Sequence, residues 1–238
     1  MTLPNNFVTV FHSFNTDLDM DTPWPKPDNY VPKDADQAIL IWGGSSSVGQ
    51  FAIQILRYYG YKNVLATASH KHHDKLRSLG AREVFDYNDA KVIESILQYG
   101  SDAGIPLTLD CIGSQKGSIK PISNIAKAGS KVAILLPVVV RDSTETETPE
   151  YEMEVKVAAD WREGVDVRGV RTHQYLDVSN NLPLCDDSLM KYRMSFSSII
   201  CNLISCPQCS KTASCQHRNR ESSRVRPCSK EHRRPWIR

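Results

Sequence analysis

The chain has 238 residues, with 29 Lys and Arg against 27 Asp and Glu, so its formal net charge is +2. This length predicts one large domain or two small ones. A charged fraction of 24% and an apolar fraction of 40% exclude a chain that is disordered or coiled-coil throughout. The longest apolar run, residues 133–140, is too short to span a bilayer, and residues 1–6 lack the features of a secretory signal. We therefore expect a cytoplasmic protein with no membrane association.

Charge and cysteine are unevenly distributed along the chain. Residues 201–238 hold nine Lys and Arg and two Asp and Glu, a local charge of +7, whereas the first 200 residues carry −5. Five of the seven cysteines also fall in residues 201–238, which leaves only Cys111 and Cys185 elsewhere. The body of the protein is thus expected to have no disulfide framework, which suits a reducing compartment.

Three segments follow from the pattern of residues. Residues 1–35 are rich in Pro, Asn and Asp and are predicted to form an extended arm. Residues 36–176 alternate short apolar runs with amphipathic stretches, which predicts a Rossmann-like, doubly wound parallel sheet with helices on both faces. The expected strands are residues 37–42, 63–68, 83–85, 107–110, 131–135 and 165–170, and the expected helices are 48–59, 74–79, 90–99 and 118–126. Residues 141–149 are expected to form a polar loop, and residues 177–238 a divergent basic tail.

A glycine- and serine-rich turn joins the first expected strand to the first helix. In the pattern G-x-G-x-x-G, Gly44 and Gly49 take the first and third places, and Ser46 replaces the middle glycine. Backbone N–H groups and the positive end of the helix dipole would face an anion here, and the hydroxyls of Ser45, Ser46 and Ser47 add donors. Gly49 would let the helix pack closely on the strand. A Gly/Ser run alone is more often a plain loop, but its place between strand and helix favours the pyrophosphate of a dinucleotide.

The end of the second expected strand favours NADPH over NADH. An NAD site usually has an acidic residue here, whereas the first acid after this strand is Asp74, which should already lie in the next helix. The residues present instead suit a 2′-phosphate. They are Ser69, Lys71 and the histidines His70, His72 and His73. The alternatives are a solvated basic turn and a chance histidine cluster; a metal site is disfavoured because no acid or thiol is near.

Tyr87 follows the third expected strand. Its ring could stack near the adenine, or its hydroxyl could reach the 2′-phosphate. The alternative is an aromatic residue on the rim with no part in binding.

Several strings together resemble the cofactor domain of the medium-chain dehydrogenase/reductase superfamily. The resemblance covers roughly residues 8–176 and is strongest to the fungal zinc-independent branch, which holds alcohol-dehydrogenase-like oxidoreductases and trans-acting enoyl reductases. The strings that carry it are residues 41–54, 66–69, 79–81, 84–87, 109–114, 131–137 and 167–172.

The resemblance implies roles for individual residues and a reaction. By resemblance, residues 45–48, including Val48, hold the pyrophosphate, residues 69–72 the 2′-phosphate, and Tyr87 the adenosine end of NADPH. Leu135 and Leu136 lie on the nicotinamide side. The implied reaction is hydride transfer to an activated double bond or carbonyl of a small-molecule or acyl-thioester substrate. In secondary metabolism that substrate can be bound to the carrier protein of a polyketide synthase.

The departures from the family pattern are equally informative. Most of the N-terminal substrate domain is missing, so the chain is expected to be a fragment. The Gly-His-Glu string that supplies a catalytic zinc ligand is also absent, and no catalytic or metal-binding residue is predicted. The rival hypothesis is a catalytically inactive nucleotide-binding module, or a partner of a full-length homologue.

The tail has the residue types of a zinc site, but its spacing matches neither a zinc finger nor the zinc lobe of the superfamily. Cys206, Cys209, Cys215 and His217 are the residues concerned. Its arginines could contact nucleic acid, although none is expected as a partner. We interpret residues 177–238 as a disordered segment from a misread gene end, with a true zinc module as the alternative.

Overall fold

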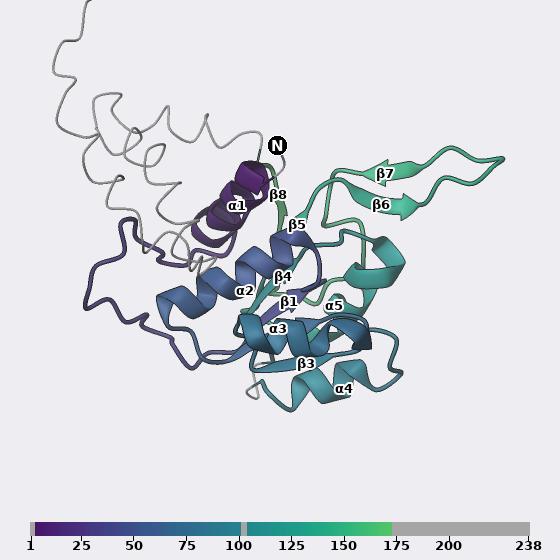
Figure 1. Cartoon of the computed structure of the whole chain (residues 1–238). Coiled ribbons are helices and arrows are strands. Elements are labelled where there is room, and N and C mark those ends of the chain that lie inside the picture. The colour runs from purple at the N-terminus through teal and green to yellow at the C-terminus, as the bar shows by residue number, and fades with distance from the viewer. Residues whose placement is uncertain (1–2, 101–103, 173–238) are drawn as a thin grey trace, which may run out of the picture. The chain divides into compact units, whose positions relative to one another are not determined.

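The computed structural model describes residues 3–100 and 104–172, and the tail lies outside these residues. Its centre is a six-stranded parallel sheet in the order β3-β2-β1-β4-β5-β8 (Figure 1). The strands are β1 Ile39–Trp42, β2 Val64–Thr67, β3 Glu83–Phe85, β4 Leu107–Asp110, β5 Lys131–Leu135 and β8 Asp166–Val170. The predicted doubly wound sheet is therefore confirmed, and the bounds of β3, β4 and β5 agree with those expected.

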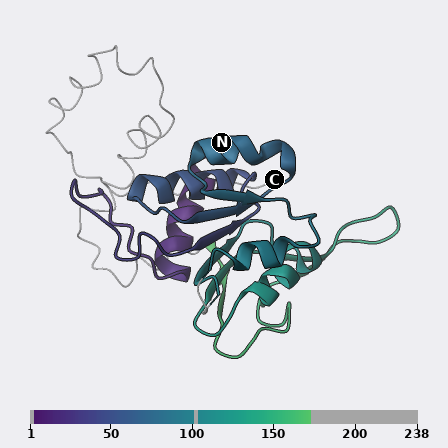
Figure 2. The ribbon, with the colours of Figure 1, turned by 90° about the horizontal axis from the view of Figure 1, so that it is seen from below.

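Helices cover both faces of the sheet (Figure 2). They are α1 Leu3–His12, α2 Ser47–Tyr59, α3 His73–Leu79, α4 Val92–Leu97 and α5 Lys120–Ile125. Side chains alternate along a strand, so Leu40 and Trp42 enter the core beneath α4 and α5. On the opposite face α2 packs against both α1 and α3. Because both faces are covered, all four residues of β1 are buried, which explains its unbroken apolar run.

The long helix α2 ends where its sequence predicts. Its apolar stripe, including Ala52, Ile55 and Leu56, is buried. Gly60 caps the helix in the left-handed conformation, with φ of 98°, which a glycine adopts without strain.

The prediction of an extended arm over residues 1–35 is wrong for its first half. Residues 3–12 form α1, and a π-helical turn, Ser13–Asp17, continues it. Phe7, Val10 and Phe14 recur on one face and are fully or almost fully buried. Phe7 packs edge-on against Phe51 of α2, with ring centroids 5.7 Å apart. Burial of this aromatic face outweighs the local abundance of Asn and Pro; residues 18–38 do run without a helix or strand.

The chain between β5 and β8 contains a hairpin whose two strands were not expected, although the polar loop predicted over residues 141–149 is present between them. Strands β6 Val138–Arg141 and β7 Glu150–Glu152 pair antiparallel, and the hairpin projects from the body (Figure 1). Residues 142–149 form its polar tip, all of them exposed. None of the described helices is long and apolar enough to cross a membrane.

Candidate functional site

The glycine turn lies at the carboxyl end of β1 and is fixed to the neighbouring strand. Gly43 has φ of +79°, a left-handed conformation that favours glycine. Its N–H donates to the hydroxyl of Thr67 at 3.0 Å, and the N–H of Gly44 donates to the Thr67 carbonyl at 2.8 Å. The turn is thus held against β2. The sequence pattern identified Gly44 but not Gly43, whose role depends on backbone conformation.

Two glycines allow the helix and the strands to approach. A Cβ atom on Gly49 would lie 2.5 Å from the carbonyl oxygen of Gly43. A Cβ atom on Gly44 would lie 3.0 Å from the Cβ of Ala66 and 3.2 Å from a methyl group of Leu76. This confirms the packing role expected of Gly49, and it shows that Gly44 has a similar one.

The serines of the turn form the start of α2. The Ser46 hydroxyl caps the helix by accepting the N–H of Gly49 at 3.0 Å. The N–H groups of Ser47 and Val48 belong to the first turn, where no acceptor within the helix is available. Asn6 of α1 donates to the Ser47 hydroxyl at 2.6 Å, and the Ser45 carbonyl accepts the side-chain amide of Gln50. No acidic residue lies in this first turn, so the positive end of the helix dipole is not neutralised.

The basic residues after β2 form a short surface turn. His70–His72 is a 3-10 turn that leads into α3, and Asp74 lies within α3 as expected. His70 and Lys71 are exposed, whereas Ser69 and His72 are half-buried. His73 differs, because its ring is buried and contacts the Ala68 carbonyl at 3.1 Å. It therefore belongs to the packing rather than to a phosphate site.

An acidic residue at this edge was missed by the sequence reasoning. Asp86 accepts the N–H of His70 at 3.3 Å. Hydrogen bonds from Asn88 and His70 lower the pKa of Asp86, so its carboxylate is charged at neutral pH. The signal was available in the strand register: Thr67 pairs with Phe85, so the residues that follow both strands are neighbours.

The remaining predicted residues lie at the same edge of the sheet. Tyr87 follows β3 and is 48% exposed. Leu135 ends β5, and Leu136 lies against Gly169 of β8. Since all strands of the six-stranded sheet are parallel, the fold gathers the predicted residues along the edge formed by their carboxyl ends. Tyr87 lies two strands from β1 on one side, and Leu135 two strands away on the other.

The turn after β4 joins this edge at its centre. Asp110 is fully buried and accepts hydrogen bonds from the Ser118 hydroxyl at 2.6 Å and from the N–H groups of Ile112 and Gly113 at 2.9 and 3.2 Å. Burial raises the pKa of Asp110 to about 6. Burial and the nearby Asp110 carboxylate raise the pKa of the Cys111 thiol. The Cys111 side chain also forms a hydrogen bond with the side chain of Ser46.

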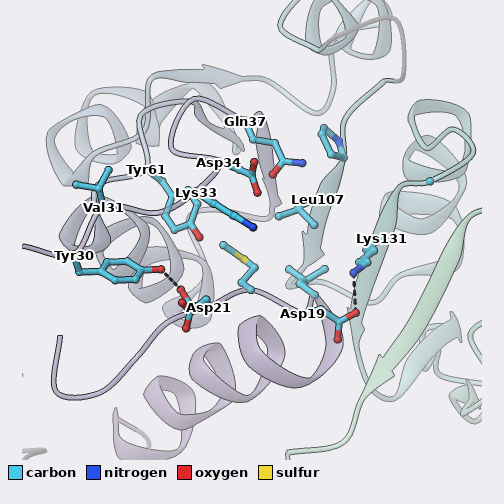
Figure 3. A pocket seen from close by; sticks show the side chains of 14 residues that line it. Asp19, Asp21, Tyr30, Val31, Lys33, Asp34, Gln37, Tyr61, Leu107 and Lys131 are labelled. Carbon is cyan, nitrogen blue, oxygen red and sulfur yellow. Dashed lines mark hydrogen bonds and ion pairs between the residues drawn. The ribbon is translucent and has the colours of Figure 1, made fainter. Parts of the chain in front are cut away.

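A separate cavity of about 660 Å³ opens at the opposite edge of the sheet (Figure 3). Gln37, Leu107 and Lys131 line it, and they stand at or just before the amino ends of β1, β4 and β5. Lys131 forms an ion pair with Asp19 there, at 2.7 Å. Burial raises the pKa of Tyr61, also in the lining, to about 12. The cavity is thus distinct from the glycine turn.

Among residues 3–100 and 104–172, no three His, Cys, Asp or Glu side chains are grouped so that they could hold a metal ion. The cysteines and histidine of the tail that suggested a zinc module lie outside these residues.

Comparison with known proteins gives matches over the same part of the chain. The family described as "Zinc-binding dehydrogenase" matches residues 47–183. The trans-enoyl reductase tazE of Aspergillus terreus is 43% identical over 104 residues, which are 43% of this chain and 33% of that protein. The trans-enoyl reductase himH of Aspergillus japonicus is 45% identical over 100 residues, 41% of this chain and 27% of that protein.

Two further comparisons extend the picture. A zinc-type alcohol dehydrogenase-like protein of Schizosaccharomyces pombe is 34% identical over 137 residues, 56% of this chain and 38% of that protein. The chain thus spans between about a quarter and two fifths of these relatives. Among solved structures, the CurK enoyl reductase superposes with a TM-score of 0.57 at 17% identity, over 83% of this chain and 50% of that one. At that identity the likeness concerns the fold alone.

Proposed function

Because this chain belongs to the zinc-binding dehydrogenase family, in the enoyl reductase branch of the medium-chain dehydrogenase/reductase superfamily, we propose that it binds NADPH as the cofactor-binding part of an oxidoreductase. Its proposed reaction is hydride transfer to an activated double bond or carbonyl. The proposed substrate is a small molecule or an acyl thioester, the latter borne by the carrier protein of a polyketide synthase. The proposed location is the cytoplasm.

One observation carries this proposal: the N-terminus of α2, which has no acidic residue in its first turn, lies at the topological switch point of the sheet. The strand β1 has β2 on one side and β4 on the other, so the chain reverses its direction of winding there. Open parallel sheets bind ligands in the crevice beyond the carboxyl ends of such strands. The proposed crevice lies beyond Gly43 and Gly44 at the capped start of α2, where a pyrophosphate can meet the backbone N–H groups of Ser47 and Val48.

The choice of NADPH rests on the turn after β2. Lys71 and His70 are exposed there, and a 2′-phosphate forms charge-assisted hydrogen bonds with such groups. Asp86 disfavours NADPH, because its negative carboxylate accepts a hydrogen bond from the His70 backbone and would repel a 2′-phosphate bound nearby. One of its oxygens accepts the N–H of His70 and the other that of Asn88, which fixes the carboxylate in place without removing its charge. Lys71 is therefore the group on which the preference for NADPH depends most.

A bound nicotinamide cofactor would supply the hydride, so the protein has to bind, orient and shield it. In the proposed arrangement Tyr87 contacts the adenosine, Ser45 to Val48 the pyrophosphate, and Leu135 and Leu136 the nicotinamide. The described residues contain no grouped metal ligands. The names of the two Aspergillus relatives favour an enoyl group as the acceptor.

The test uses the purified full chain. NADPH binding is measured by calorimetric titration, and turnover is followed as loss of NADPH absorbance with crotonyl thioesters. Turnover supports the oxidoreductase, whereas binding without turnover supports the inactive nucleotide-binding module. A chain that binds no NADPH contradicts both. Gly49→Val serves as the control, because a Cβ atom at this site would lie 2.5 Å from the Gly43 carbonyl and distort the site.

A further inference from the structure

The turn after β4, residues 111–114, connects the two halves of the candidate site. On one side, the Ile112 side chain lies over Gly43, so that a Cβ atom on Gly43 would be 2.5 Å from it. On the other side, a Cβ atom on Gly113 would be 2.5 Å from the carbonyl oxygen of Leu135. The turn at residues 111–114 therefore fills the space between the glycine turn at Gly43 and the end of β5.

Asp110 fixes the conformation of this turn from inside the protein. One carboxylate oxygen accepts the N–H groups of Ile112 and Gly113, and the other accepts the Ser118 hydroxyl. The Ser118 oxygen in turn accepts the N–H of Ser114 at 3.0 Å. Both ends of the turn are thus held by one buried carboxylate, which at 0% exposure cannot touch a ligand itself.

The held turn reaches the groups that surround it by further contacts. The Gly113 carbonyl accepts the N–H of Val139 at 2.7 Å, which ties the turn to the segment after β5. Ile112 is 48% exposed although it is a large apolar side chain, and it would be covered by a ligand in the crevice. In a sheet of this order, β4 and β5 carry the mononucleotide half that is away from β2 and β3.

We propose that Asp110 is a positioning residue for the nicotinamide half of the dinucleotide, acting through the turn at Ile112 and Gly113. This inference rests on the proposed function, since it presumes that NADPH binds in the crevice. It adds that the nicotinamide half of the site depends on a turn whose conformation is held by Asp110.

The test compares NADPH with 2′-phospho-ADP-ribose, which lacks the nicotinamide. Asp110→Ala removes all three hydrogen bonds, so it should weaken NADPH binding at least tenfold and change binding of the fragment less than threefold. It should also reduce the rise in nicotinamide fluorescence at saturating NADPH. Asp110→Asn keeps a side-chain oxygen for the two N–H groups, and its amide can donate to Ser118, so it should bind NADPH within threefold of the parent.

A second variant covers the case in which Asp110→Ala does not fold. Ser118→Ala removes one hydrogen bond of the carboxylate and should weaken NADPH binding about threefold, again without affecting the fragment. Ser123→Ala is the matched control, because it removes a serine hydroxyl bonded only to the Lys120 carbonyl in α5. Equal losses for both ligands, or no loss for either, would overturn the positioning role. A parent chain that binds neither ligand would instead show that the proposed function is wrong.

Discussion

Asp19 accepts a hydrogen bond from each terminal nitrogen of Arg168, at 3.0 and 3.1 Å, although the two residues are 149 positions apart. Lys131 donates to the same carboxylate at 2.7 Å. These contacts tie the segment after α1 to β5 and β8. Both cations lower the pKa of Asp19.

Asp19→Asn is predicted to lower the free energy of unfolding by about 1 kcal/mol at pH 7, at the upper end for exposed ion pairs because two cations share one carboxylate. The lowered pKa means that this stabilisation is present above about pH 4 and is lost as the pH falls through the folded-state pKa. Urea unfolding measures the effect. The control is Asp36→Asn, since Asp36 is 82% exposed in its pair with Lys62; an equal loss in both variants would contradict the prediction.

Asp17, two residues earlier, should behave in the opposite way. It is buried, one of its oxygens has no hydrogen-bond partner among the described residues and lies 4.0 Å from Nε2 of His12, and burial raises the pKa of Asp17 to about 6. The folded state thus holds a proton that the unfolded state releases, so stability falls as the pH rises from about 4 to 6. Asp17→Asn should raise the free energy of unfolding by about 1–2 kcal/mol at pH 8 and flatten this part of the profile. An unchanged profile in urea unfolding between pH 4 and 8 would count against it.

Ser46 allows the helix cap to be separated from the cofactor site. Ser46→Ala should cost about 1 kcal/mol of stability, because Gly49 loses its acceptor. Ser46→Asp keeps an acceptor and places a negative charge at the helix N-terminus, so stability should match or exceed the parent. The same charge should repel a pyrophosphate and weaken NADPH binding at least tenfold. Thermal unfolding and calorimetry test both parts, and retention of affinity by Ser46→Asp would place the pyrophosphate elsewhere.

The alternation of buried strands and amphipathic helices was enough to predict the parallel sheet. Ile39 and Leu40 point to opposite faces of the sheet and both are buried, so the strand has a continuous apolar run in the sequence. The edge of the sheet that gathers Ser46, Lys71 and Tyr87 follows from parallel strands alone.

Features that depend on tertiary contacts could not be read in this way. The helix α1 was not predicted because residues 1–35 are rich in Pro and Asn, and it is stabilised by packing of Phe7 on Phe51. The hairpin of β6 and β7 has no strand pattern of its own in the sequence, because β6 continues the apolar run of β5 and β7 has only three residues, two of them Glu. The role of Asp110 depends on burial and on three partners that only the folded chain brings together.

The tail carries a prediction that the described residues do not address. A chain that ends at residue 183, where the family match ends, should keep the melting temperature and NADPH affinity of the full chain. From residue 205 on, the removed residues are rich in Arg and poor in large apolar side chains, and ordering a residue costs about 1–2 kcal/mol of backbone entropy. Zinc content is measured in parallel, since a four-ligand zinc site would contribute about 10 kcal/mol or more. Stoichiometric zinc and a lower melting temperature on truncation would show a folded zinc module.

Lys71 is predicted to determine the choice of cofactor. Lys71→Glu replaces an attractive charge with a repulsive one beside the 2′-phosphate, so the preference for NADPH should disappear. Lys75→Glu makes the same change of charge on an exposed residue of α3 and should keep the preference. Loss of the preference in both variants would indicate a long-range effect of net charge rather than a contact at Lys71.

The most direct test of the account is a titration of the full parent chain with NADPH and with NADH under the same conditions. We predict that NADPH binds at least tenfold more tightly, a difference of about 1.4 kcal/mol. Equal affinities for the two cofactors, or no binding of either, would contradict the account.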